Sequence, residues 1–307
     1  MAPHVPVWLA VAKLAREQRL PHLLLYGPPG TGKTSTVLAI ARELYGKQAG
    51  SMALELNASD DRGIDVVRQQ ISDFASTAQL FAKGHKLVVL DECDQMTKDA
   101  QFALRRIMER HSRSTRFCLL CNHVSKVIPA IQSRCTRFRF SPLPPEDARS
   151  RVQHVASAEG VDLTDDGLDA VLKIGSGDMR RSINILQSVH MAAGHIDSRA
   201  VHLCTGTPEQ AQVEGLLSSL LCKPFKQCVD HVLTLQSENG VALVDLVREL
   251  GALVFRLGAG AAARAELVDA LADCEYRLSY ATCERVQVQA LVGAFVNARD
   301  SISQAAR

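Results

Sequence analysis

The sequence predicts an α/β domain built on a parallel sheet, followed by a small helical domain and an all-α C-terminal domain. Three observations support this fold class. Short apolar runs alternate with helical patterns up to about residue 140, a proline-rich segment then interrupts the pattern, and only helical patterns follow it. Alternating strands and helices are typical of a parallel sheet that helices cover on both faces.

The first part of the chain supplies the candidate strands and helices of the sheet domain. The strand segments are largely continuous apolar runs, which indicates burial on both faces. They are Leu23–Tyr26, Ala53–Leu56, Leu87–Leu90, Phe117–Cys121 and Arg137–Phe140. The helical segments between them are Ser35–Tyr45, Ile64–Phe74, Asp99–His111 and Lys126–Ile131, the first ending at Gly46, a residue type that commonly closes helices.

Ser141-Pro-Leu-Pro-Pro-Glu146 marks the predicted end of the sheet domain, because proline fixes φ and removes a backbone donor. Beyond it, Thr164 is the predicted N-cap of one helix and a second helix is expected after Asp178. Apolar residues between Leu243 and Leu257, and again between Leu267 and Leu278, recur at the spacing of one helix face. The expected domains are residues 1–141, 142–204 and 205–307.

Composition excludes several classes of protein. The 307 residues are 47% hydrophobic and 22% charged, which are ordinary globular values. The sequence shows no apolar run of 18 residues and no secretory pattern in Met1–Leu20, so we expect no membrane span and nine free thiols. Cys118 and Cys121 lie three apart in a strand segment and point to opposite faces, which is poor geometry for a metal.

The segment from Gly27 to Thr34 fits the pattern G-x-x-x-x-G-K-[ST] of a phosphate-binding loop. A strand segment precedes it and a helix follows it, as this motif requires. Glycines let the backbone wrap around phosphates, and the helix N-terminus adds positive potential. The predicted phosphate contacts, with Lys33 on the β- and γ-phosphates and the Thr34 hydroxyl on Mg²⁺, are Gly27, Pro28, Pro29, Gly30, Thr31, Gly32, Lys33, Thr34 and Ser35.

Asp91 and Glu92 follow the apolar strand segment Leu87–Leu90 and are predicted to complete the site. Ligands of such sheets bind at the carboxyl ends of the strands. We expect Asp91 to approach Mg²⁺ through water and Glu92 to polarise the attacking water. A water-activating glutamate at this position favours a hydrolase over a P-loop kinase.

Three further polar residues are candidates for the nucleotide site, although each could instead have only a structural or solvent-exposed role. Asn122 ends a strand segment, where it either orients a water or only forms a turn. Arg134, in Ser133-Arg-Cys135, lies on a predicted turn, where most arginines are simply solvated. Arg180 opens a helix, where a cation is unfavourable for the dipole, which suggests a bound anion, although Asp178 and Ser176 could compensate.

Basic residues are concentrated between Lys98 and Arg139. Ten basic residues oppose two acidic ones there, a local charge of 10 − 2 = +8, against +2 for the whole chain. Such a run is either a solvated face or a phosphate-binding surface. Three residues serve as candidate DNA contacts, with a partner interface or plain surface as the alternatives: Arg68, Lys98 and Arg105.

These motifs together resemble the clamp-loader branch of the AAA+ ATPases, and more narrowly the small subunits of eukaryotic replication factor C. The blocks that carry the resemblance are Leu20–Thr34, Glu55–Gly63, Ala103–Glu109, Ser133–Cys135 and Gly177–Arg181, with Cys204–Gly206 and Leu271–Ser279 extending it to the C-terminus.

The resemblance implies a nuclear subunit of a five-subunit spiral that uses ATP and Mg²⁺ to open a sliding clamp ring and place it on primer–template DNA during replication and repair. It implies that Asn122 is a sensor of the γ-phosphate, that Arg134 is an arginine finger acting on a neighbour's ATP, and that Arg180 is a second sensor. The C-terminal helices would form the collar that joins the subunits, and the basic span would face DNA phosphates.

The chain departs from the family pattern at two places. Asp91-Glu-Cys-Asp94 replaces the family's Asp-Glu-Ala-Asp, which leaves both catalytic carboxylates in place. Met1–Leu20 lacks the Lys-Tyr-Arg-Pro segment that helps enclose adenine, so the expectation of nucleotide binding depends on the phosphate site. Two rival functions are a structural subunit that binds nucleotide and DNA without essential hydrolysis, and a helicase motor, which Ser133-Arg-Cys135 and the helical C-terminus disfavour.

Overall fold

The computed structural model describes residues 20–58, 64–77, 84–280 and 283–305, together with Leu9, Val11, Lys13, Leu14 and Glu17. The chain forms two compact units, Met1–Val152 with Leu172–Ile183, and Gln153–Val171 with Asn184–Arg307. The division into domains at residues 141 and 204 stays a prediction.

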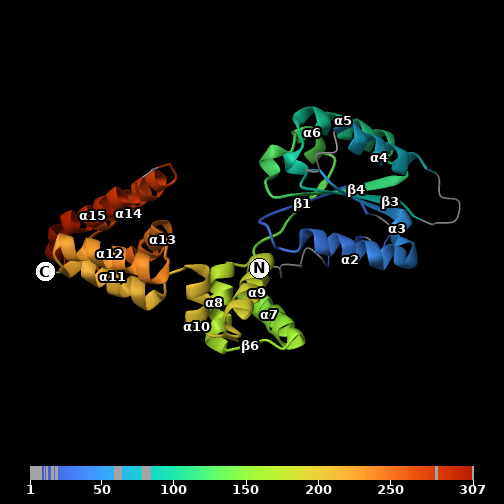
Figure 1. The fold of residues 1–307 in the computed structure, drawn as a ribbon. Coiled ribbons are helices and arrows are strands. Elements are labelled where there is room, and N and C mark those ends of the chain that lie inside the picture. The colour runs from blue at the N-terminus through green and yellow to red at the C-terminus, as the bar shows by residue number, and fades with distance from the viewer. Residues whose placement is uncertain are drawn as a thin grey trace. The chain divides into compact units, whose positions relative to one another are not determined.

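The first unit is built on a parallel five-stranded sheet with the strand order β2-β3-β4-β1-β5 (Figure 1). Every strand predicted from the apolar runs is present. The strands are β1 (Leu23–Tyr26), β2 (Ala53–Asn57), β3 (Lys86–Asp91), β4 (Thr115–Cys121) and β5 (Thr136–Arg139).

Helices cover both faces of this sheet, as Figure 1 shows. One face packs against α2 (Lys33–Tyr45), the other against α4 (Ile64–Ser76), α5 (Lys98–Arg110) and α6 (Pro129–Gln132). Alternate residues of β4 belong to the two cores, since Cys118 packs on the α2 face and Cys121 on the opposite face. The short helix α3 (Ala49–Met52) leads into β2.

The predicted helix Lys126–Ile131 is wrong in its extent. A short 3-10 turn, η3 (Val124–Lys126), is followed by extended backbone at Val127 and Ile128, and α6 begins only at Pro129. Proline disfavours helical backbone in the residue before it and is well suited to the first helical turn. Pro129 therefore divides one apparent helical pattern into two elements.

The carboxyl ends of β1, β3 and β4 meet at one edge of the sheet. Tyr26 pairs with Cys121, and β3 adjoins β4, so the residues after these strands emerge side by side. Gly27, Glu92 and Asn122 are those residues. A second 3-10 turn, η2 (Cys93–Gln95), follows Glu92.

The helices of the segment after the proline-rich linker are α7 (Pro145–Glu159), α8 (Asp165–Gly175), α9 (Met179–Ala193) and α10 (Ser198–Thr205). The Thr164 hydroxyl accepts a hydrogen bond from the backbone N–H of Gly167 at 3.1 Å, which confirms the predicted cap of α8. The helix expected after Asp178 is α9. Within the second unit, the short strands β6 (Asp162–Leu163) and β7 (His195–Ile196) pair in parallel.

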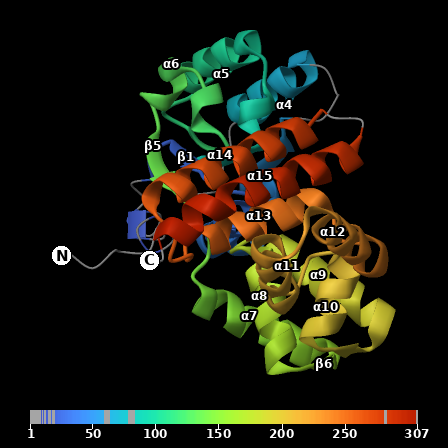
Figure 2. The same cartoon turned by 90° about the vertical axis from the view of Figure 1, so that its left-hand side faces the viewer.

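The second unit also contains the predicted C-terminal helices. They are α11 (Gln210–Cys222), α12 (Phe225–Asn239), α13 (Leu243–Val254), α14 (Ala261–Leu278) and α15 (Glu284–Ala305), with α14 and α15 side by side (Figure 2). Residues of all five helices form one apolar core, including Leu246, Leu250 and Leu267 from the predicted stripes. Among the helices of the described residues, none combines the length and apolarity needed to cross a membrane.

Candidate nucleotide-binding site

The predicted phosphate-binding loop connects β1 to α2 and contains three glycines with positive φ. Gly27, Gly30 and Gly32 have φ angles of 152°, 66° and 86°, a region that other residues rarely adopt. A Cβ on Gly27 would lie 2.1 Å from the Phe140 carbonyl oxygen, so a side chain cannot fit there. The loop conformation that exposes backbone N–H groups at the start of α2 therefore requires these glycines.

Lys33, the first residue of α2, points back into this loop. Its Nζ donates to the carbonyl oxygens of Gly27 and Pro28 at 2.9 and 2.8 Å and to Asn122 Oδ1 at 3.0 Å. The side chain is buried, and desolvation lowers the pKa of Lys33, with nearby Asp91 opposing this effect. The ammonium thus lies between the loop and the end of β4, where a phosphate group can replace its present acceptors.

Thr34 and the acidic end of β3 are in direct contact. Thr34 Oγ1 donates to Asp91 Oδ2 at 2.7 Å, and the other carboxylate oxygen accepts the backbone N–H of Glu92 at 2.8 Å. Glu92 adopts left-handed backbone with φ 54°. Strain of this kind is frequent at functional sites, and here it turns the chain sharply directly after Asp91.

A third acidic residue of this segment, Asp94, is buried, and no role was predicted for it from the sequence. Asp94 Oδ2 accepts the backbone N–H of His123 at 3.0 Å, whereas its buried Oδ1 accepts no hydrogen bond from the described residues. The negative charge raises the pKa of Lys33 against the effect of burial. The D-E-x-D pattern was the available signal for this residue.

Cys93, the departure from the family's alanine, is buried next to Cys121 in the core on the α5 face. A hydrogen bond with Cys121 and desolvation raise the pKa of the Cys93 thiol. A neutral, buried thiol behaves as a small apolar residue. The substitution is therefore accommodated in the core and leaves Asp91 and Glu92 in place.

The start of α9 lies on the phosphate-binding loop within the first unit. The Met179 backbone N–H donates to the Gly30 carbonyl oxygen at 3.2 Å, and a Cβ on Gly30 would lie 1.6 Å from Asp178 Oδ1. The same carboxylate oxygen caps α9 by accepting the Arg181 N–H at 3.1 Å. Arg180 is exposed, and its charge lowers the pKa of Lys33, which places its positive charge near the loop.

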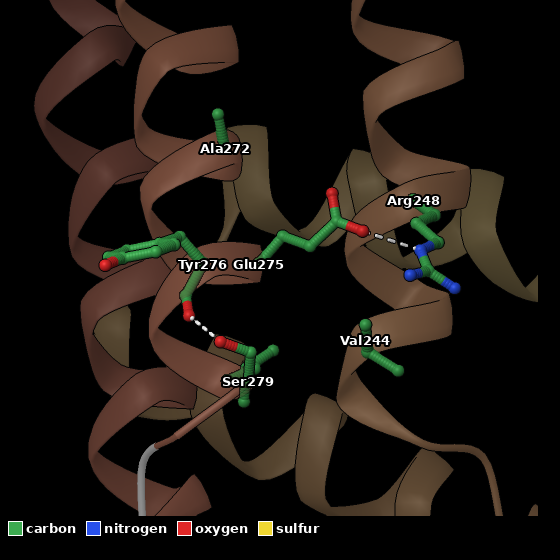
Figure 3. Close-up of a pocket in the computed structure, with 7 residues that line it drawn as sticks. Val244, Arg248, Ala272, Glu275, Tyr276 and Ser279 are labelled. Atoms are coloured by element: carbon green, nitrogen blue, oxygen red, sulfur yellow. Dashed lines mark hydrogen bonds and ion pairs between the residues drawn. The ribbon is translucent and has the colours of Figure 1, made fainter. Parts of the chain in front are cut away.

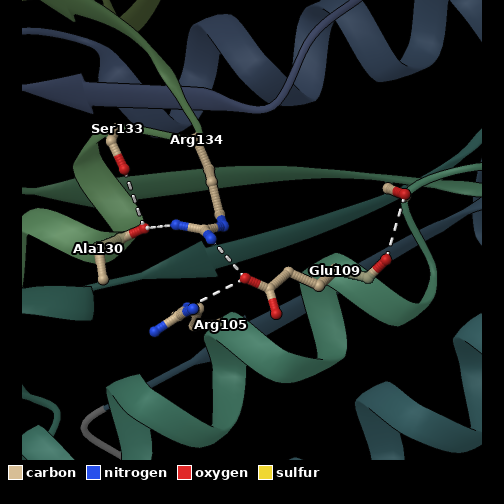
Figure 4. A network of polar contacts seen from close by, with 6 residues as sticks. Arg105, Glu109, Ala130, Ser133 and Arg134 are labelled. Atoms are coloured by element: carbon tan, nitrogen blue, oxygen red, sulfur yellow. Dashed lines mark hydrogen bonds and ion pairs between the residues drawn. The ribbon is translucent and has the colours of Figure 1, made fainter.

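Arg134 belongs to a separate cluster at the turn between α6 and β5 (Figure 4). Its Nη2 contacts Glu109 Oε1 at 2.5 Å, and its Nη1 donates to the Ala130 carbonyl oxygen at 2.6 Å. Arg105 Nε donates to the same Glu109 oxygen at 3.0 Å. The sequence did not single out Glu109, although it ends the block Ala103–Glu109.

The three candidate DNA contacts lie in different surroundings. Lys98 is the exposed first residue of α5. Arg105 is half-buried and paired with Glu109, so it is not a simple solvated cation. Arg68 lies on α4, but its side chain falls outside the described residues.

A magnesium ion fits the residues at the end of β3. The Thr34 hydroxyl and the Asp91 carboxylate are hard oxygen donors, and their 2.7 Å contact brings them to one point beside Lys33. Mg²⁺ is typically held by one or two such groups together with phosphate oxygens and water. We expect Thr34 and Asp91 to hold it when a triphosphate binds.

The helical unit has its own hollow on the surface of α13 and α14 (Figure 3). Arg248 Nε donates to Glu275 Oε1 at 2.7 Å across it, and this bond raises the pKa of Arg248. Tyr276 is 69% exposed beside it. This hollow does not include the phosphate-binding loop or the strand ends, because its lining consists of Val244, Arg248, Ala272, Glu275, Tyr276, Leu278 and Ser279.

Comparisons with known proteins agree with this architecture. Residues 23–143 match the family model "ATPase family associated with various cellular activities (AAA)", and residues 208–294 match "Replication factor C C-terminal domain". The chain is 52% identical over its full length to replication factor C subunit 3 of rice, covering 86% of that protein. Over 97% of its length it is 50% identical to human replication factor C subunit 5, covering 88% of that protein.

The chain belongs to the replication factor C subunits of the AAA family. The predicted fold class, the family resemblance and the assignment as an ATPase are confirmed. A mutant of Thermotoga maritima RuvB shares the fold at 15% identity, with a TM-score of 0.51 over 76% of this chain and 79% of that one. The roles of individual site residues of this replication factor C subunit stay predictions.

Proposed function

We propose that this replication factor C subunit binds and hydrolyses ATP within a nuclear hetero-oligomer that opens a sliding clamp and places it on primer–template DNA. The observation that carries the proposal is the contact between Thr34 and Asp91 beside the Lys33–Asn122 hydrogen bond. These two contacts join the phosphate-binding loop to the ends of two neighbouring strands. The relatives' names, which make them replication factor C subunits, support membership of an assembly that acts in replication.

Binding begins with the triphosphate in the loop. Backbone N–H groups at the start of α2 and the Lys33 ammonium offset its negative charge. Lys33 exchanges its carbonyl and Asn122 acceptors for phosphate oxygens, a small movement because Nζ already lies within 3.0 Å of all three. Thr34, and Asp91 through water, would hold a magnesium ion, which would further neutralise the phosphate charge.

Hydrolysis needs a positioned water and stabilisation of the charge that develops on the γ-phosphate. Glu92 directly follows Asp91 at the sheet edge and orients the water. Asn122, released from Lys33, contacts the γ-phosphate or that water. Arg180 approaches the phosphates from the start of α9, and Arg134 acts on the nucleotide of a neighbouring subunit.

DNA binding is assigned to the basic span of the first unit. Lys98, the first residue of α5, is one of its exposed members. Contacts from such residues to phosphates give affinity that falls with salt and does not depend on sequence. Arg105 contributes less, because Glu109 already neutralises part of its charge.

Assembly is assigned to the C-terminal helices. Phe255, Tyr276 and Tyr280 are 66%, 69% and 64% exposed in the single chain. Exposed aromatic residues of this kind are enriched at protein interfaces. The helical unit thus offers a surface that another subunit's helices can cover.

Glu92→Gln tests hydrolysis against the rival of a purely structural subunit. We expect the assembled complex to keep nucleotide binding at this site while single-turnover hydrolysis there slows by about 10²-fold or more. Glu55→Gln, an exposed glutamate on β2, is the matched control and leaves turnover unchanged. Unchanged single-turnover hydrolysis and clamp loading by Glu92→Gln would favour the structural subunit.

A further inference from the structure

Glu109 links Arg134 to α5 through a single carboxylate oxygen. Oε1 lies 2.5 Å from Arg134 Nη2 and 3.0 Å from Arg105 Nε, so both guanidinium groups converge on the same atom (Figure 4). The second anchor of Arg134 is the Ala130 carbonyl oxygen, 2.6 Å from Nη1. The finger side chain is thereby held at both terminal nitrogens.

The cluster is at the surface, which limits its value for stability. The side chains of Arg134 and Glu109 are 34% and 41% exposed. Ion pairs of this exposure contribute little to folding, because water and salt screen them. Their geometric effect is different, since an arginine held at two nitrogens has lost rotamer freedom before any ligand arrives.

The cluster of Arg105, Glu109 and Arg134 keeps a net positive charge, so Arg134 can still bind a phosphate. A glutamate carboxylate is ionised at neutral pH, so two arginines and one glutamate sum to +1. Hydrogen bonds from Arg105 and Arg134 lower the pKa of Glu109. A guanidinium group has five N–H donors, and the two contacts above do not use them all. The remaining N–H groups of Arg134 can therefore donate hydrogen bonds to a γ-phosphate while the contact with Glu109 is kept.

We propose that Glu109 is a positioning residue for the arginine finger Arg134, and that Arg105 orients Glu109 for this task. The inference depends on the proposed role of Arg134 and adds the residues that aim it. Arg105, predicted from sequence as a DNA contact, then acts at the ATP interface between subunits. We expect the length of the Glu109 side chain to matter more than its charge for positioning Arg134. The length sets where Oε1 lies, whereas solvent screens the charge of a side chain this exposed.

A set of Glu109 variants distinguishes the effect of side-chain length from the effect of charge. Glu109→Gln keeps the reach and an acceptor oxygen but removes the charge, whereas Glu109→Asp keeps the charge and shortens the side chain by one methylene. In the assembled complex we expect Glu109→Ala and Glu109→Asp to lower the finger-dependent part of kcat about tenfold, as misplacement of a catalytic group does. Glu109→Gln should stay closer to the wild type, and KM should change little in all variants.

The decisive control repeats each substitution in an Arg134→Ala background. The ATPase activity lost on Arg134→Ala alone defines the finger-dependent turnover, and Arg151→Ala on α7 serves as a matched exposed arginine. If Glu109 acts through Arg134, its substitutions have no further effect once Arg134 is absent. Native mass spectrometry of each complex verifies that all subunits are present.

Each outcome has a definite meaning. Three results together support the inference. Glu109→Ala and Glu109→Asp lower the finger-dependent part of kcat, and Glu109→Gln nearly retains it. None of these substitutions has an effect in the Arg134→Ala background. Equal losses in both backgrounds, unchanged kcat, failure of the Glu109 variants to assemble, or higher kcat in both Ala and Gln would overturn it. If Arg134→Ala itself leaves ATPase activity unchanged, the proposed finger fails, and that result is distinct from a failure of Glu109.

Discussion

The Thr34 hydroxyl donates a 2.7 Å hydrogen bond to Asp91 Oδ2, which joins the start of α2 to the end of β3. Fifty-seven positions separate these residues in the chain. The second such link runs from Lys33 Nζ to Asn122 Oδ1 at 3.0 Å. Together they bring the phosphate-binding loop and two strand ends to one place, where a triphosphate and its metal would bind.

Removal of the lysine at this place should abolish nucleotide binding. Lys33→Ala deletes the ammonium group that offsets phosphate charge, so we expect ATP affinity to fall at least about 10²-fold, the weight of a charge-assisted contact in a partly buried site. Fluorescent nucleotide titration of this subunit measures it. Lys47→Ala, an exposed lysine in the turn after α2, should bind normally; equal affinity of the two variants would contradict the assignment.

Gly27 should be intolerant of even a methyl group. Its φ of 152° and the 2.1 Å approach of a Cβ to the Phe140 carbonyl oxygen force the backbone between β1 and β5 to move. We expect Gly27→Ala to cost about 2 kcal/mol or more of unfolding free energy, measured by urea denaturation. Gly50→Ala in α3 meets nothing within 4 Å and should be neutral or slightly stabilising. Similar stability of the two variants would show that the Gly27 turn is not required.

His22 should make stability fall on mild acidification. Desolvation, reinforced by Arg116, lowers its pKa to about 4, and its Nδ1 accepts the Phe117 N–H at 3.1 Å. Between pH 6.5 and 4, His22 is protonated in the unfolded chain but stays neutral in the folded chain. The free energy of unfolding therefore decreases as the pH falls through this range. We expect a loss of about 1–2 kcal/mol at pH 5 relative to pH 7, allowing for partial exposure.

His22→Asn tests this origin, because the asparagine oxygen can replace Nδ1 as acceptor but does not titrate. Urea denaturation at pH 5 and 7 should show a smaller pH dependence than in the wild type. The exposed His154→Asn should keep the wild-type pH dependence. An unchanged pH dependence in His22→Asn would assign the effect to other groups.

Two exposed tyrosines of the helical unit should matter for assembly more than for folding. Tyr276 and Tyr280 pack edge to face with ring centroids 5.2 Å apart and remain largely exposed. We expect replacement of both by serine to leave the thermal midpoint of the single chain nearly unchanged and to weaken assembly about tenfold or more. Native mass spectrometry across a dilution series measures it, with Met191→Ser, 80% exposed, as the control. Unweakened assembly would place the interface elsewhere.

Much of the first unit could be predicted because its strands are buried on both faces. Short continuous apolar runs such as Leu87–Leu90 and Phe117–Cys121 are typical of buried strands. The fixed spacing of glycines and a lysine between Gly27 and Thr34 predicts the phosphate-binding loop. The helix predicted at Lys126–Ile131 failed because apolar spacing alone did not register the effect of Pro129 on Val127 and Ile128.

Contacts between distant segments could not be predicted in the same way. The approach of Asp178 to Gly30, the burial of Asp94 and the pairing of Glu109 with Arg134 depend on how helices and turns pack, not on local pattern. Arg105 shows the consequence. Local charge suggested a DNA contact, whereas its ion pair with Glu109 places it beside the proposed finger.

Iron-mediated backbone cleavage tests most directly whether the loop and the strand end converge on one metal–triphosphate. Fe²⁺ replaces Mg²⁺ with ATP in the assembled complex, peroxide and ascorbate generate hydroxyl radicals at the metal, and mass spectrometry locates the cuts. The account predicts ATP-dependent cleavage next to both Thr34 and Asp91, and none in Lys33→Ala. Cleavage at one of these segments without the other, or at both without ATP, would contradict a shared site.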